Sequence, residues 1–220
     1  VDGWMVNSSD YHDSEYPGDY FKQRSFLSGF TGSAGTLVVT VEEAGLWTDG
    51  RYFVQAAHQL EGSGITLYKM GQKDVPAIAE FLAEKLPENG CLGFDGRTVG
   101  QEYYLELKKT LEEKRIRFSL LEDLGDKVWE DRPALSCEKV WILDAEKYSG
   151  MTAAEKLAKV RESMKKAGAT VHLLTSLDDI AWLFNIRGGD VECNPVALSY
   201  AAVTMSDAVL FVQEKALDSE

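Results

Sequence analysis

Positive charge is scarce in this sequence. Its 220 residues include 23 lysines and arginines against 36 aspartates and glutamates, which gives a formal net charge of −13. Proteins that bind along nucleic acid need a positive face to displace counterions, and an anionic membrane surface repels a strongly acidic chain. We therefore expect neither nucleic acid nor a membrane as a partner.

Cysteine and histidine are equally scarce, with three of each. Cys91, Cys137 and Cys193 lie far apart, which is typical of a reduced cytoplasmic protein rather than of a disulfide scaffold or a zinc site. The histidines show no HExxH spacing, and no GxSxG nucleophile motif is present. No run of about 18 apolar residues could form a membrane-spanning helix. The sequence thus predicts a cytoplasmic location and no metal or cofactor site within these residues.

The remaining composition is that of an ordinary globular protein, with 45% hydrophobic and 27% charged residues. Strand-like apolar runs at 36–41, 45–47 and 118–121 alternate with amphipathic helical patterns at 78–86 and 101–114. This alternation predicts an α/β fold in which mixed sheets are flanked by helices.

Two helix details follow from the pattern. We expect Asp74 to cap a helix that runs from 75 to 86 and has Pro76 in its first turn. We expect an earlier helix to direct Phe53, Ala57 and Leu60 inward, because these residues recur at helical spacing.

A linker is predicted at 131–136, where Pro133 disfavours both helix and sheet pairing. The pattern then restarts with a strand at 140–143 and a helix that opens on Thr152 as a capping box. We therefore expect one domain at 1–133 and a second at 134–220. The second is only about half the size of a common domain, so we expect it to be incomplete. Both halves begin with strand, helix and strand, which hints at an internal duplication.

The segment 177–196 is rich in tryptophan, glycine and paired charges. We expect Asp179 to cap a short helix and Trp182 and Phe184 to lie in the core. Arg187 and Asp190 are expected to form an ion pair across the two glycines between them. The same charged residues could instead form a surface that docks onto a further domain.

Four segments, in this order and spacing, resemble the N-terminal domains of the three-domain Xaa-Pro aminopeptidases of the creatinase/prolidase superfamily. They are FTGSAGT at 30–36, LWTDGRYF at 46–53, WEDRP at 129–133 and LDDIAWLFNIRGGDVECNPV at 177–196. The resemblance covers almost the whole chain. It implies two successive creatinase N-terminal-like domains with the ribonuclease H-like motif, the second truncated.

The resemblance also implies an activity for the longer protein. Such an enzyme removes the N-terminal residue that precedes proline from short peptides and assembles as a homodimer. Catalysis uses two divalent metals, usually manganese, in a C-terminal catalytic domain that is absent from these residues. These N-terminal domains would then shape substrate access and dimerisation, and the fragment alone would be inactive.

Two substrate-binding residues are expected. The resemblance implies that Glu15, in the loop after the first strand, holds the substrate's free ammonium group through a charge-assisted hydrogen bond. The residues alone favour the alternative that Glu15 is a plain loop carboxylate. Arg51 presents a rigid guanidinium fork that could contact a substrate or a partner domain. A salt bridge from Arg51 to Asp49 that fixes the turn is the alternative.

A second function class stays open at this stage. Creatinase-like folds also occur as non-enzymatic domains in histone chaperones, so the chain could be a peptide- or protein-binding module. The pairing of FTGSAGT with LWTDGRYF favours the peptidase.

Overall fold

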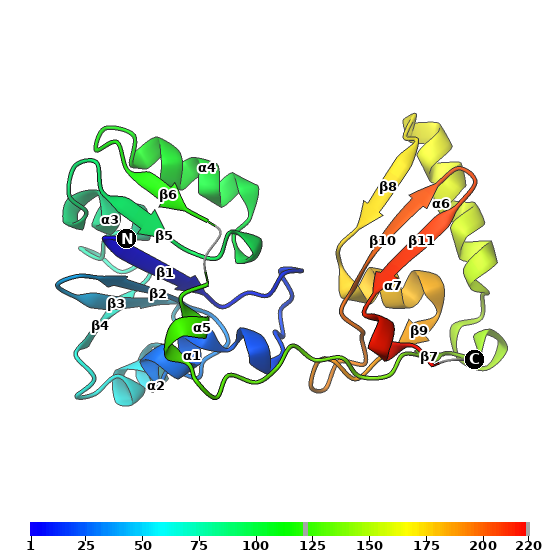
Figure 1. The fold of residues 1–220 in the computed structure, drawn as a ribbon, viewed down its shortest axis with the longest axis horizontal. Coiled ribbons are helices and arrows are strands. Elements are labelled where there is room, and N and C mark those ends of the chain that lie inside the picture. Colours follow the sequence, from blue (N-terminus) through cyan, green and yellow to red (C-terminus); the bar gives the residue numbers. More distant parts are fainter. Residues whose placement is uncertain (121–122, 219–220) are drawn as a thin grey trace. The chain divides into compact units, whose positions relative to one another are not determined.

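The computed structural model describes residues 1–120 and 123–218. The chain forms two compact units, Val1–Pro133 and Ala134–Glu220 (Figure 1). None of the described helices is both long enough and apolar enough to cross a bilayer.

The first unit is built on a six-stranded mixed sheet with the order β4-β3-β2-β1-β5-β6. Its strands are β1 (Gly3–Asn7), β2 (Thr36–Thr40), β3 (Ala44–Thr48), β4 (Ile65–Lys69), β5 (Cys91–Gly93) and β6 (Arg117–Ser119). The strands β1, β2 and β3 form an antiparallel meander, and β4, β5 and β6 extend it with parallel pairings.

Helices cover both faces of this sheet, because alternate residues of a buried strand point to opposite sides and both sets are apolar. The helices α1 (Gln23–Ser28) and α2 (Phe53–Gln59) share one core with Trp4 and Val6 of β1. The helices α3 (Ile78–Lys85) and α4 (Gln101–Thr110) share the other core with Met5. A short helix α5 (Gly125–Val128) and 3-10 turns at Asp19–Phe21 and Gly96–Thr98 complete the unit.

The predicted boundaries need three corrections in this unit. The helix α3 begins at Ile78 rather than after Asp74, because Asp74 adopts a left-handed backbone (φ 63°) that is not helical. On α2 the buried alanine is Ala56, and Ala57 is exposed. The helix α1 was not predicted at all. The last residue of the strand predicted at 118–121 lies outside the described residues.

The second unit holds an antiparallel three-stranded sheet with the order β11-β10-β8. Its strands are β8 (Val171–Leu174), β10 (Ser199–Thr204) and β11 (Ala208–Val212). A small second sheet pairs β7 (Trp141–Ile142) with β9 (Ile186–Arg187). A π-helical turn at Ala145–Ser149 and a 3-10 turn at Glu214–Ala216 flank these strands.

Two helices, α6 (Ala153–Ala167) and α7 (Leu177–Phe184), pack on one face of the larger sheet. The predicted capping box of α6 is confirmed: the Thr152 hydroxyl accepts from the Glu155 N–H (3.2 Å), and the Glu155 carboxylate accepts from the Thr152 N–H (2.8 Å). The helix α7 is capped by Ser176, whose hydroxyl accepts from the Asp179 N–H.

Two expectations for the second unit were wrong. Trp182 is 52% exposed rather than buried, and only Phe184 packs against the core. Arg187 donates to the carbonyls of Ala181 and Ile186. Asp190 accepts its hydrogen bonds from other donors, so the expected ion pair between Arg187 and Asp190 does not form.

Candidate functional site

A polar depression of about 710 Å³ lies in the first unit, beside the end of β1. It brings together both predicted site residues, Glu15 and Arg51. Its lining comes from the loop after β1, the turn before β2, the turn before α2 and the beginning of α4: Asn7, Ser8, Ser9, Asp13, Ser14, Glu15, Ser33, Ala34, Gly35, Thr36, Arg51, Thr98, Gly100, Glu102, Tyr103 and Glu106.

The loop that carries Glu15 is held by a buried carboxylate. Asp10 is 1% exposed, and its Oδ1 accepts hydrogen bonds from the His12 N–H (2.8 Å) and the Ser14 N–H (2.9 Å). This is the hydrogen-bonding pattern by which aspartate closes tight turns. Asp13 adopts the left-handed backbone (φ 55°) between these two donors. Glu15 therefore directly follows an ordered turn, and its own side chain is exposed at the depression.

The turn before β2 is organised by Arg24, a residue that the sequence did not single out. Arg24 is 4% exposed, and its guanidinium donates to the Phe30 carbonyl (2.9 Å), the Gly32 carbonyl and the Ser8 hydroxyl (2.6 Å). Burial lowers the pKa of Arg24 to about 10. The group stays charged at neutral pH and ties the FTGSAGT turn to the loop after β1.

Arg51 is bound in its own turn. Its Nε and Nη2 donate to the two oxygens of Asp49 at 3.0 and 2.8 Å, and its backbone N–H donates to the same carboxylate. These hydrogen bonds are the main reason that the pKa of Arg51 is raised, with smaller contributions from the charges of Asp49, Tyr52 and Glu15. The salt bridge to Asp49 is thus present, and a contact from Arg51 to substrate stays a prediction.

The charge of the depression is negative. Asp13, Glu15, Glu102 and Glu106 line it, whereas Arg51, the cation among its described lining residues, is already paired with Asp49. Burial, helped by the charge of Glu106, raises the pKa of the lining Tyr103 to about 12, so this phenol keeps its proton. Such a surface attracts cations and offers acceptors for an ammonium group.

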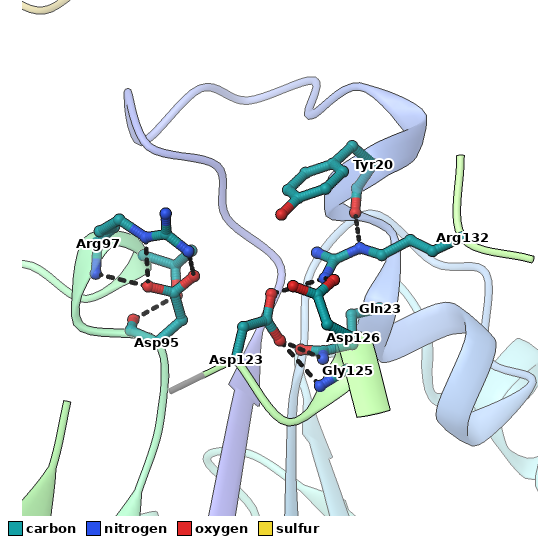
Figure 2. A network of polar contacts seen from close by, with 9 residues as sticks. Tyr20, Gln23, Asp95, Arg97, Asp123, Gly125, Asp126 and Arg132 are labelled. Atoms are coloured by element: carbon teal, nitrogen blue, oxygen red, sulfur yellow. Dashed lines mark hydrogen bonds and ion pairs between the residues drawn. The ribbon is translucent and has the colours of Figure 1, made fainter. Parts of the chain in front are cut away.

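A second cluster of polar side chains lies where the chain leaves the first unit (Figure 2). Arg132 of the WEDRP segment donates to the carboxylates of Asp123 (2.6 Å) and Asp126 (2.7 Å) and to the Tyr20 carbonyl (2.9 Å), and its guanidinium lies 3.8 Å from the Tyr20 ring centre. Gln23 donates to the other oxygen of Asp123 (2.8 Å). The prediction of a linker at this segment did not foresee its buried charge.

Beside this cluster, Arg97 binds Asp95 in the same way as Arg51 binds Asp49 (Figure 2). The Arg97 guanidinium lies 4.3 Å from the ring centre of Tyr11. Burial is the main cause that raises the pKa of Tyr11 above its ordinary value.

The described residues, 1–120 and 123–218, contain no group of three or more histidine, cysteine, aspartate or glutamate side chains placed to hold a metal ion. The carboxylates that line the depression can accept hydrogen bonds from a cationic or peptide group.

Comparison with known proteins accounts for both units. Residues 2–128 and residues 131–220 each match the Creatinase/Prolidase N-terminal domain. The probable Xaa-Pro aminopeptidase P of Coprinopsis cinerea is 44% identical over 220 residues, and the Xaa-Pro aminopeptidase ApepP of Drosophila melanogaster is 38% identical over 222. The match covers 99% and 100% of this chain but 35% and 36% of those relatives, so the chain spans about a third of their length.

A solved structure agrees. The X-prolyl aminopeptidase from Caenorhabditis elegans, described as a cytosolic enzyme with a di-nuclear active site, matches with a TM-score of 0.91 and 38% identity over 100% of this chain and 36% of that one. The predicted α/β fold of two successive creatinase N-terminal domains is thereby confirmed. The chain belongs to the Creatinase/Prolidase N-terminal domain family.

Proposed function

We propose that this chain is the N-terminal, non-catalytic part of an Xaa-Pro aminopeptidase, which removes the residue before proline from the N-terminus of short peptides. The observation that carries the proposal is the 44% identity to an Xaa-Pro aminopeptidase P over 99% of the chain. The di-nuclear active site described for the Caenorhabditis elegans enzyme supports it.

On this proposal the hydrolytic step belongs to the rest of the longer protein. Two divalent metals, manganese by the family resemblance, would activate a hydroxide and polarise the scissile carbonyl there. The purified 220-residue chain should then release no amino acid from an Arg-Pro-Pro peptide, even with added Mn²⁺. Turnover by the pure chain, measured by mass spectrometry of the products, would contradict the assignment.

We assign the depression to the recognition of the substrate's free N-terminus. An α-ammonium group needs a carboxylate acceptor, and Glu15 offers one on an ordered turn within a negatively charged surface. The exposed Glu15 carboxylate gains strength when a bound peptide or another domain excludes water from it. Arg51 would contact the peptide with the face of its guanidinium that Asp49 leaves open.

The substitution Glu15→Gln in the full-length enzyme tests this assignment. It keeps the size of the side chain but removes its charge, so we expect kcat/KM for an Xaa-Pro peptide to fall about tenfold with unchanged thermal stability. The matched control is Glu88→Gln, an exposed glutamate in the turn between α3 and β5. Equal kinetics for both variants and the wild type would remove Glu15 from the site.

The same proposal includes a cytoplasmic homodimer, in which these domains contribute to the subunit interface. Analytical ultracentrifugation of the full-length enzyme and of the 220-residue chain checks this part separately. A full-length enzyme that sediments as a monomer at micromolar concentration would refute it.

A further inference from the structure

Four dipeptides in this chain join an aspartate or an asparagine to a glycine: Asp2-Gly3, Asp49-Gly50, Asn89-Gly90 and Asp95-Gly96. In such a pair the glycine nitrogen can attack the carbonyl carbon of the preceding side chain, because glycine has no Cβ in the way and its backbone is easily turned. The product is a five-membered succinimide ring, which reopens mostly to isoaspartate. A pair reacts in a folded protein only where the fold leaves the glycine nitrogen free to reach the side chain.

Three of the four glycines are held by backbone contacts. The Gly96 N–H donates to the Leu120 carbonyl (3.1 Å). The Gly90 N–H donates to the Pro87 carbonyl (3.0 Å), and Gly90 is buried. Gly3 is a buried residue of β1, which pairs with β2 on one side and with β5 on the other. Attack by any of these nitrogens would first have to break these backbone contacts.

Gly50 differs from the other three. Within the described part of the chain no atom accepts a hydrogen bond from its N–H, and the residue is exposed. A Cβ added at Gly50 would meet, apart from its chain neighbours, only Phe53 at 3.9 Å, so the space beside it is open. A Cβ added at Gly96 would lie 3.1 Å from Leu120. The nitrogen is therefore free to move at Gly50 and confined at Gly96.

The turns at Asp49-Gly50-Arg51 and Asp95-Gly96-Arg97 form a matched pair within one molecule. In each, the arginine donates through Nε, Nη2 and its backbone N–H to the aspartate, over 2.8–3.0 Å (Figure 2 shows the second turn). The Asp49 side chain is 38% exposed and that of Asp95 12%. The two turns thus share their ion pair and differ in the freedom of the glycine nitrogen and in the exposure of the aspartate.

We propose that Asp49 is the residue at which this folded protein forms isoaspartate, and that Arg51 slows the reaction. The Gly50 nitrogen forms a bond to Cγ of Asp49, and its proton leaves with the carboxyl hydroxyl as one water molecule. Water then adds to the ring. Cleavage of the bond between Cγ and the nitrogen restores aspartate, whereas cleavage of the bond between the main-chain carbonyl carbon and the nitrogen gives isoaspartate. No oxidant or cofactor takes part.

Arg51 acts on the first of these steps. The carboxyl group reacts as the neutral acid, because an ionised carboxylate has no good leaving group. Hydrogen bonds from the Arg51 side chain and then from its backbone N–H hold the pKa of Asp49 below its ordinary value of 3.8. The same hydrogen bonds fix the carboxylate in one orientation. Both effects reduce the fraction of time in which Asp49 is ready to react.

The modification would reach the depression of the first unit. Isoaspartate lengthens the main chain by one carbon between Thr48 and Gly50, directly before Arg51, which lines the depression. The two-point contact between Arg51 and Asp49 would then be lost. This consequence for substrate binding rests on the proposed function, whereas the formation of isoaspartate does not.

Ageing of the purified chain tests the proposal. The wild type is kept at physiological temperature and pH for several weeks, and isoaspartate at each of the four sites is quantified by peptide mapping with electron-transfer fragmentation. The same chain in concentrated guanidinium chloride gives the rate of each site without the fold. In the folded chain we expect isoaspartate at position 49 and none above background at positions 2, 89 and 95, although position 89 should react fastest in the unfolded chain.

Two variants separate the ion pair from the glycine nitrogen. Arg51→Ala should speed the formation of isoaspartate at position 49 by about two- to fivefold, the rate equivalent of one exposed ion pair. Arg97→Ala should leave Asp95 unmodified, because the Gly96 N–H stays bound to Leu120.

The opposite results would overturn the proposal. One is isoaspartate at position 95 of the wild type or of Arg97→Ala as fast as at position 49. Another is an unmodified Asp49 in the folded chain after the unfolded chain has largely converted. A rate at position 49 that Arg51→Ala leaves unchanged would refute the protective role of Arg51.

Discussion

Removal of the Arg132 side chain is predicted to destabilise the first unit strongly. The side chains of Arg132 and Asp123 are 8% and 6% exposed and lie 2.6 Å apart, so the pair is removed from water. Arg132→Ala would leave the Asp123 carboxylate buried with only the Gln23 amide and the Gly125 N–H as donors among the described residues. It would also remove the hydrogen bond to the Tyr20 carbonyl.

The expected loss is about 3–5 kcal/mol of unfolding free energy, the usual result of breaking a buried ion pair from one side. Arg51→Ala is the control, because it removes an arginine that is also hydrogen-bonded to an aspartate, but at the surface. Its side chain is 67% exposed, so water takes over the lost interaction and little or no stability is lost. The contrast between the two variants isolates the effect of burial.

The loss should also depend on pH. Burial alone would raise the pKa of Asp123, but its hydrogen bond and ion pair with Arg132, with smaller help from Gly125 and Gln23, hold that pKa below its ordinary value of 3.8. A folded pKa below the unfolded one stabilises the protein above pH 3.8, and this stability is lost as the pH falls through the folded value. In Arg132→Ala the pKa of Asp123 rises, so the difference in stability between the wild type and the variant should shrink as the pH falls through the lowered pKa of Asp123 in the wild type.

Urea denaturation followed by tryptophan fluorescence measures these quantities. Trp141 and Trp182 of the second unit are 48% and 52% exposed, so replacing both by phenylalanine leaves a signal from the first unit only. A double-mutant cycle with Asp123→Asn separates the pair energy from other losses. A loss for Arg132→Ala below about 1 kcal/mol, or a loss equal to that of Arg51→Ala, would refute the argument from burial.

Two further predictions concern single residues. Gly32→Ala should destabilise the first unit by about 1–3 kcal/mol, because the new Cβ would lie 2.3 Å from Cζ of Phe30; urea denaturation checks this, and an unchanged midpoint would contradict it. Burial lowers the pKa of Lys156, so the free energy of unfolding of the second unit should increase as the pH rises from that lowered pKa towards 10.5. Lys156→Met should abolish this increase, which denaturation at a series of alkaline pH values measures. A parallel slope in both proteins would contradict the second prediction.

Local signals in the sequence predicted local structure well. The predicted capping box at Thr152 and Glu155 is formed by neighbours in the chain and is present. The helix ends at Gly168, which adopts the left-handed conformation (φ 69°). The helix α1 escaped prediction because it is short and its buried residues are polar: Gln23, Arg24 and Ser28. Amphipathic periodicity gives no signal in such a helix.

Long-range contacts explain why the predicted ion pair between Arg187 and Asp190 does not form. Arg187 and Asp190 have the spacing of an ion pair, but Asp190 accepts from the Ser136 hydroxyl, the Glu138 N–H and the Leu198 N–H, all at 2.7–2.8 Å. Two of these donors lie in or just after the linker, and the third directly precedes β10. The spacing of residues along the sequence cannot reveal such contacts.

The candidate site likewise combines residues that the sequence pointed to with residues that only the fold brings close. The family resemblance pointed to Glu15, and the chemistry of the guanidinium group pointed to Arg51. These residues are well separated in the sequence and line one depression. Two further carboxylates of the depression, Glu102 and Glu106, come from α4. They reach the depression because β5 pairs with β1, a crossover that the sequence does not encode locally. The negative charge of the site is therefore a product of the sheet order.

The two buried charges near the linker are best understood together. Arg132 fastens the chain to the first unit through Asp123 and the Tyr20 carbonyl. Asp190 fastens it to the second unit through Ser136 and Glu138. Each charge is satisfied within its own unit, so each unit keeps its end of the linker ordered by itself. Pro133, whose ring fixes its own φ, lies between these two anchors. A buried charge at each end of a short segment thus defines where one domain stops and the next begins.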